Sequence, residues 1–155
     1  MLPMPGNLLM GRRLDADLAY LRAAGISLLV TLNPEPELAR LACPTFLDDV
    51  RAAGLESLHF AILDGGAPHD LSATDSFVTD LRARITGGQK VGLHCLAGLG
   101  RTGTMAACVL IRGGATYHEA IRIVRTARSP RAIETALQEA FISTYYEWVR
   151  HHAPP

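Results

Sequence analysis

Residues 90–103 read KVGLHCLAGLGRTG, and this stretch decides how the rest of the chain is interpreted. Its first part is apolar and predicts a strand, while the apolar run from Arg101 to Arg112 predicts a buried helix. The loop between them is rich in glycine, and its Cys95 lies six positions before Arg101. A turn of this kind can point its backbone N–H groups inward and hold an oxyanion at a helix N-terminus. The stretch therefore predicts a strand–loop–helix unit with an anion site in the loop.

The cysteine and the arginine of this loop suit a bound phosphate. Arg101 can grip two oxygens of a tetrahedral anion, and the electropositive surroundings of Cys95 favour a nucleophilic thiolate. The expected phosphate-binding residues are Leu96, Ala97, Gly98, Leu99, Gly100 and Arg101. A buried cysteine is more often a small apolar residue, but that interpretation leaves the spacing to the arginine unexplained. The loop thus predicts a phosphomonoester hydrolase.

Two other phosphate-binding motifs do not fit the chain. Residues 98–103 match G-x-G-x-x-G, the dinucleotide fingerprint, which needs a second strand about 20 residues later that ends in an acidic residue. After Gly103 the sequence predicts only helices, and Glu119 lies near the start of one of them. A Walker A loop is excluded because Gly-Lys-Ser/Thr does not occur.

The composition indicates one ordinary globular domain. The 155 residues are 48% hydrophobic and 19% charged, and we expect a domain over residues 1–150 followed by a tail over 151–155. Fifteen basic residues balance fifteen acidic ones, which argues against nucleic-acid and membrane-surface partners. The N-terminus lacks the features of a secretory signal, and no apolar run in the later half is long enough to span a bilayer.

The three cysteines, Cys43, Cys95 and Cys108, have unrelated spacings. This argues against a disulfide framework and a zinc site, and it favours a cytoplasmic location, where thiols stay reduced.

Strands and helices are expected to alternate along most of the chain. We expect helices over residues 15–24, 45–53, 72–85, 101–112, 117–127 and 133–150, and strands over 8–10, 26–32, 55–63 and 90–94. This order predicts an α/β fold with a central, mostly parallel sheet of about four to five strands flanked by helices, and a helical C-terminal third. Ligands of such sheets bind beyond the carboxyl ends of the strands, where Cys95 falls.

Three side chains near the loop complete the expected chemistry. Asp64 follows the third expected strand, on a Gly/Pro-rich loop that can close over a substrate. Its carboxyl group can protonate a leaving oxygen. Alternatively, Asp64 only starts a turn. The hydroxyl of Thr102 can donate to Cys95, although a threonine is also ordinary at a helix start. His94 points to the other side of the strand from Cys95, so we expect a buried support for the loop and no general base.

Residues 91–103 resemble the signature loop of the cysteine-dependent protein tyrosine phosphatases. The chain length and residues 62–68 resemble the small dual-specificity branch of that superfamily. Residues 6–9, 24–32 and 128–135 with Gln138 also recur in that branch, so the likeness covers nearly the whole chain, although only the signature loop is highly specific.

The resemblance implies a protein tyrosine phosphatase-like fold and a role for each residue of the site. Cys95 would be the nucleophile that forms a phosphocysteine, and Arg101 with the amides of residues 96–101 would bind phosphate. Asp64 would act first as an acid and then as a base for water, and Thr102 would assist departure of the thiolate.

The resemblance also implies that Asn33 and Gln138 border the site. No metal or cofactor is expected, because Arg101 and the amides supply the charge stabilisation. A phosphate, sulfate or vanadate ion is expected to bind in the loop.

The variable loop positions bear on the substrate. Phosphoinositide phosphatases of the superfamily tend to place lysines where this chain has Leu96 and Leu99, which disfavours a polyphosphorylated ring. A phosphorylated protein, on tyrosine or on serine and threonine, or a small aryl phosphomonoester is expected.

Other functions of the same loop remain open. One is a phosphatase for another non-protein phosphomonoester. Another is a non-catalytic phosphate-binding scaffold, although such proteins usually lack the cysteine, the arginine or the acid. A sulfur-transferring or arsenate-reducing enzyme is a third, and neither Cys43 nor Cys108 has the loop that a resolving cysteine needs.

Overall fold

Three parallel strands form the centre of the molecule in the computed structural model, which describes residues 1–7 and 11–152. Their order is β2-β1-β3, and their bounds are Leu28–Thr31 (β1), Glu56–His59 (β2) and Val91–His94 (β3). The central strand β1 is apolar and fully buried, as parallel strands covered on both faces are. At its carboxyl end Thr31 is in register with His59 and with His94.

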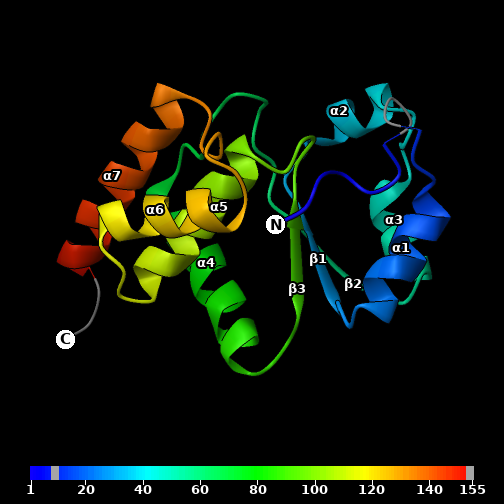
Figure 1. Ribbon diagram of the computed structural model, residues 1–155, viewed down its shortest axis with the longest axis horizontal. Helices are drawn as coiled ribbons and strands as arrows, with labels where there is room; N and C mark the ends of the chain where they lie inside the picture. Colours follow the sequence, from blue (N-terminus) through cyan, green and yellow to red (C-terminus); the bar gives the residue numbers. More distant parts are fainter. Residues whose placement is uncertain (8–10, 153–155) are drawn as a thin grey trace.

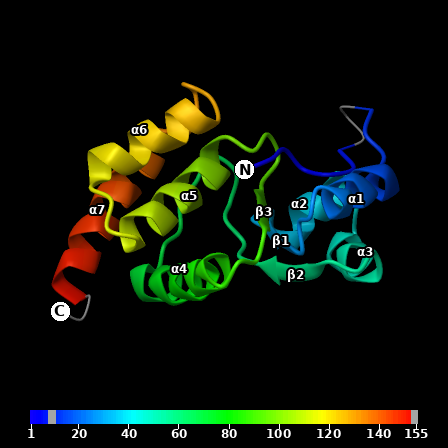
Figure 2. The ribbon, with the colours of Figure 1, turned by 60° about the horizontal axis from the view of Figure 1, so that its bottom comes forward.

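Helices cover the sheet in two groups (Figures 1 and 2). Their bounds are Leu14–Ala23 (α1), Glu35–Arg40 (α2), Phe46–Ala52 (α3), Leu71–Thr86 (α4), Gly100–Arg112 (α5), Tyr117–Ala127 (α6) and Ala136–His152 (α7). Helices α1 to α3 lie on one side of the sheet and α4 to α7 on the other. Because side chains alternate along a strand, Leu28 and Val30 pack in the core of the second group and Leu29 in the core of the first.

Helix α5, which follows the glycine-rich loop, is the buried helix that the sequence predicts. It packs against α4, α6 and α7, and its side chains from Met105 to Ile111 contribute to the larger core. Its position directly beyond β3 places the loop at the carboxyl edge of the sheet. The predicted α/β class, parallel sheet and helical C-terminal part are confirmed.

The expected count of about four to five strands is not confirmed. Residues 1–7 and 11–152 contain the three strands and one isolated parallel bridge, between Leu2 and His94. Leu2 donates to the Leu93 carbonyl and Met4 to that of Leu96, but Pro3 between them has no N–H with which to extend the ladder. The strand expected over residues 8–10 lies outside the described residues.

Two helices differ from expectation. Helix α2 was not expected, because Asn33-Pro34 indicates only the end of the strand over residues 26–32. The prolines at 34 and 36 fit the N-cap and the first turn of this helix. Helix α7 begins at Ala136 and not at Ile133, because Ile133 has φ 64°, outside the helical region. It continues through His152, two residues into the expected tail.

Within the described part of the chain, none of the helices combines the length and the apolar character that crossing a bilayer requires.

Candidate active site

The loop from Cys95 to Leu99 turns its carbonyl groups away from its concave side. All five carbonyl oxygens from residue 96 to residue 100 accept hydrogen bonds, from Met4 N, the Arg128 guanidinium (twice), Gly103 N and Ile133 N, and Thr104 Oγ1. Among residues 1–7 and 11–152, no backbone N–H from Leu96 to Thr102 has a protein acceptor. The amides are therefore free to bind an oxyanion, as in other backbone nests.

Two glycines of the loop are required by close packing. Gly98 has φ 71°, and a Cβ there would overlap the carbonyl oxygen of Leu2. A Cβ at Gly100 would lie 2.5 Å from a carboxylate oxygen of Glu134. A side chain at Gly98 would displace the N-terminal segment that supports the loop, whereas one at Gly100 would displace the side chains of Glu134 and Gln138.

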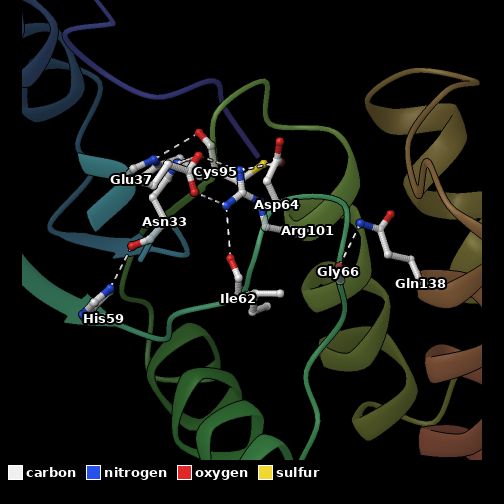
Figure 3. A network of polar contacts seen from close by, with 10 residues as sticks. Asn33, Glu37, His59, Ile62, Asp64, Gly66, Cys95, Arg101 and Gln138 are labelled. Atoms are coloured by element: carbon white, nitrogen blue, oxygen red, sulfur yellow. Dashed lines mark hydrogen bonds and ion pairs between the residues drawn. The ribbon is translucent and has the colours of Figure 1, made fainter. Parts of the chain in front are cut away.

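Arg101 reaches from the first turn of α5 into the site, and its side chain is almost fully buried. Nη1 donates to Glu37 Oε2 (2.6 Å) and to the Ile62 carbonyl (3.1 Å). Nη2 donates to Glu37 Oε1 (3.0 Å) and pairs with Asp64 Oδ1 at 2.8 Å (Figure 3). Burial lowers the pKa of Arg101, but the hydrogen bonds to Glu37 and the nearby negative charges raise it overall. The guanidinium is thus a permanently charged group fixed at the mouth of the loop.

Glu37 is a site residue that the sequence did not reveal. Burial has the largest single effect and raises the pKa of its carboxyl group, but the hydrogen bonds from Arg101 and Asn33, together with the charges of Arg101 and Arg40, lower the pKa overall. Asn33, predicted to border the site, donates from Nδ2 to Glu37 Oε1 at 2.8 Å and is fully buried. Asn33 is therefore linked to Arg101 through Glu37. The only signal in the sequence was an acidic residue four positions after a polar residue at a strand end.

Asp64 lies on the loop that follows β2, and residues of the α7 region hold this loop. Gln138 Nε2 donates to the Gly66 carbonyl at 3.0 Å, and Thr135 Oγ1 donates to the Gly65 carbonyl at 3.1 Å. Gln138, predicted to border the site, is buried and contacts the loop that carries Asp64 (Figure 3). The Asp64 side chain itself is 73% exposed, so it can move while its loop stays anchored.

Cys95 and Thr102 are both buried. Cys95 is 3% exposed, and its charge contributes to the raised pKa of Arg101. Its sulfur and the charged ends of Arg101 and Asp64 gather in one place in Figure 3. Thr102 Oγ1 is buried and has no hydrogen-bond partner among the described residues. Its hydroxyl is therefore available to a group that forms during a reaction.

His94 lies under the loop, at the end of β3, with no exposed surface. Its Nε2 is 2.9 Å from Thr31 Oγ1, its Nδ1 is 3.3 Å from the Cys95 carbonyl oxygen, and its ring contacts Phe46. Burial lowers the pKa of His94 to about 4, so the ring is neutral near pH 7. The ring sits where a buried support for the loop was predicted.

Together these groups are suited to displacement at a tetrahedral phosphorus. Free amides and a fixed guanidinium can hold the oxygens, a thiol lies beneath, and a carboxylate lies at the rim.

Comparisons with known proteins point to one superfamily. The model of a family described as "Polymorphic toxin system, DSP-PTPase phosphatase" matches residues 7–115. Cyclin-dependent kinase inhibitor 3 of Sus scrofa is 29% identical over 143 residues, which cover 91% of this chain and 67% of that protein. The chain thus spans about two thirds of the length of that relative.

Two solved structures share the fold over most of the length of this chain. Kinase associated phosphatase, with its catalytic-site cysteine replaced by serine, has a TM-score of 0.89 and 26% identity, covering 97% of this chain and 86% of that chain. Tk-PTP in the active form has a TM-score of 0.78 and 30% identity, covering 94% of this chain and 88% of that chain.

Proposed function

Because the chain belongs to the DSP-PTPase phosphatase family and is a protein tyrosine/dual-specificity phosphatase, we propose that it works through a covalent phosphocysteine on Cys95. One observation carries this proposal. The loop from residue 96 to residue 100 has every carbonyl engaged on its outer side, while its amides are free and the Arg101 guanidinium is fixed beside them.

In the first step the phosphate of the substrate binds to these amides and to Arg101. The Cys95 thiolate attacks phosphorus, the P–O bond to the leaving group breaks, and Asp64 gives its proton to the leaving oxygen. The position of Asp64 supports this role, because its exposed side chain lies at the phosphate site, and phosphate binding to Arg101 would release it from the guanidinium.

In the second step Asp64, now a carboxylate, takes a proton from water. The water oxygen attacks phosphorus, the S–P bond breaks, and the thiolate of Cys95 leaves. The Thr102 hydroxyl donates a hydrogen bond to this thiolate, a role supported by its burial without a partner in the described structure. Gln138 holds the loop of Asp64, Asn33 acts on Arg101 through Glu37, and His94 supports the loop from below.

The substrate that fits best is a phosphorylated protein side chain or a small aryl phosphomonoester. Leu96 and Leu99 place no extra positive charge in the loop for a second phosphate on a ring. The three cysteines are free and buried, which fits a reducing location such as the cytoplasm.

Hydrolysis of p-nitrophenyl phosphate tests the mechanism. We expect activity that survives EDTA, is blocked by vanadate and is lost in Cys95→Ser, while Cys95→Ser still binds vanadate. Activity that requires an added metal, or that persists in Cys95→Ser, would contradict the mechanism. Vanadate binding by a wild-type protein without turnover would favour the non-catalytic scaffold.

A further inference from the structure

A pocket of about 290 Å³ opens beside Asp64, between helix α2 and the catalytic loops. It shares Glu37, Asp64 and Leu96 with the site described above, and its remaining lining residues are Pro34, Pro36, Arg40, Leu41 and Leu63. Its volume lies at the lower end of small-molecule sites, and we take it as room for one side chain.

The walls of this pocket are apolar and partly rigid. Leu63 is 75% exposed, although it directly precedes Asp64, and Pro34, Pro36 and Leu41 also line the pocket. An exposed leucine gains free energy when an apolar group covers it, roughly in proportion to the buried area. Proline walls lose little conformational entropy when they are covered. The pocket therefore favours an apolar side chain.

Of the charged side chains that line the pocket, Arg40 is the one that can pair with a ligand. Both carboxylates, Glu37 and Asp64, pair with Arg101. Arg40 is exposed at the end of α2 and acts on Glu37 only through its charge, with no hydrogen bond or ion pair within the described ranges. An acidic group at the pocket rim would therefore be attracted to Arg40.

We propose that this pocket is a specificity site for the polypeptide around the phosphorylated residue, taking a flanking apolar side chain while an acidic residue beside it pairs with Arg40. The proposal rests on the phosphatase function proposed above.

The pocket adjoins the phosphate-binding loop, and this position favours the substrate polypeptide as its occupant. Leu96 follows the proposed nucleophile and lines the pocket, so a phosphate in the loop brings a residue adjacent to the phosphorylated one to this pocket. A membrane surface fits less well. The pocket is concave, and Arg40 is its only charge without a partner in the described residues, whereas anionic lipid recognition uses clusters of basic residues.

Matched phosphotyrosine peptides test the proposal. The peptides differ at two positions: the residue next to phosphotyrosine is either leucine or serine, and the residue after that is either glutamate or glutamine. We expect wild-type kcat/KM to be about tenfold higher for leucine–glutamate than for serine–glutamine, and to fall about threefold to fivefold when only glutamate becomes glutamine. Arg40→Glu should reverse the glutamate preference and leave p-nitrophenyl phosphate hydrolysis unchanged. Leu63→Ser should reduce the ratio of kcat/KM between the leucine peptide and the serine peptide. A change in the rate of the chemical step would affect both peptides equally and would leave this ratio unchanged.

Arg122→Glu is the matched control, because Arg122 is an exposed arginine on α6, outside the pocket. Unchanged peptide ratios in Arg40→Glu and Leu63→Ser, with p-nitrophenyl phosphate still hydrolysed, would overturn the specificity site alone. An Arg40→Glu effect confined to phosphatidylinositol phosphate vesicles would also overturn it, in favour of a lipid surface. If the wild-type protein did not hydrolyse p-nitrophenyl phosphate, this would instead contradict the phosphatase mechanism itself.

Discussion

The Asp64 carboxylate occupies one N–H of Arg101 that a bound phosphate would need. Asp64 Oδ1 lies 2.8 Å from Nη2, while Glu37 and the Ile62 carbonyl take the other Nη hydrogens. A guanidinium has five N–H donors, so, counting acceptors among residues 1–7 and 11–152, only the Nε–H is without a partner while Asp64 is bound. Because Glu37 already spans the two Nη atoms, a bidentate grip on phosphate would use Nε and Nη2, and therefore Asp64 and the phosphate compete for Nη2 of Arg101.

This competition predicts that Asp64→Asn binds oxyanions more tightly. Removing the negative charge weakens the competition for Nη2, because an amide oxygen is a poorer acceptor than a carboxylate, and it removes the repulsion of the incoming anion. We expect vanadate to bind about tenfold more tightly, which corresponds to ~1.4 kcal/mol. Isothermal titration calorimetry measures this, with Asp48→Asn, an exposed carboxylate on α3 paired with Arg51, as the control. Equal or weaker vanadate binding by Asp64→Asn would show that the carboxylate does not compete.

The acid role of Asp64 predicts a dependence on the leaving group. Phenoxide leaves without much help, whereas an alkoxide needs a proton. Asp64→Asn should therefore slow hydrolysis of p-nitrophenyl phosphate less than that of a phosphoserine peptide. The comparison is the ratio of kcat between variant and wild type for each substrate. Equal losses on both substrates would argue against an acid at this position.

Glu37→Gln is expected to lower both stability and phosphate affinity. The variant removes the charge that faces the buried Arg101, while Asp64 and Ile62 still contact the guanidinium, so we expect a loss of about 1–3 kcal/mol of unfolding free energy. Arg101 would also be less firmly oriented, and the dissociation constant for vanadate should rise. Urea unfolding and calorimetry measure the two effects.

Glu35→Gln is the matched control, because Glu35 is exposed in the first turn of the same helix. A Glu37→Gln variant as stable as Glu35→Gln, with unchanged vanadate binding, would show that Glu37 does not hold Arg101 in solution.

The buried His94 predicts a loss of stability in mild acid. Burial lowers the pKa of His94 to about 4, so below the ordinary value near 6.5 the unfolded chain takes up a proton that the folded protein refuses. Stability from this group is complete above pH 6.5, falls as the pH drops toward 4, and then levels off. Between pH 7 and pH 4.5 the loss should be on the order of 2–3 kcal/mol.

His94→Asn removes this proton and serves as the comparison. The variant should be less stable at pH 7 but should lose less unfolding free energy on acidification than the wild type. Urea unfolding at several pH values measures both slopes. Parallel slopes would mean that His94 does not stay neutral in the folded protein.

The sequence predicted the part of the site that is built from neighbouring residues. The strand, the glycine-rich loop and helix α5 follow one another directly, and each has a local signal: an apolar run, glycines at close approaches, and an apolar helix. The positions of Cys95 and Arg101 follow from that local order. Asp64 was placed by the same rule, since it follows a strand and parallel strands end at one edge.

The parts that the sequence did not reveal depend on contacts between distant residues. Helix α2 is only six residues long and is held by the buried Leu38 and by the pairing of Glu37 with an arginine 64 positions away. Short helices are set by such packing more than by propensity. Arg128 supports the loop from 30 positions away in the sequence, and periodicity carries no trace of that contact.

Capture of the reaction intermediate tests directly whether the reaction proceeds through a phosphocysteine on Cys95. The enzyme is mixed with a phosphotyrosine peptide, denatured within milliseconds in alkaline detergent, digested, and analysed by mass spectrometry. We expect a phosphate on the sulfur of Cys95, formed as fast as the phenol is released and absent in Cys95→Ser. Steady turnover with phosphate on no residue, or on a residue other than Cys95, would contradict it.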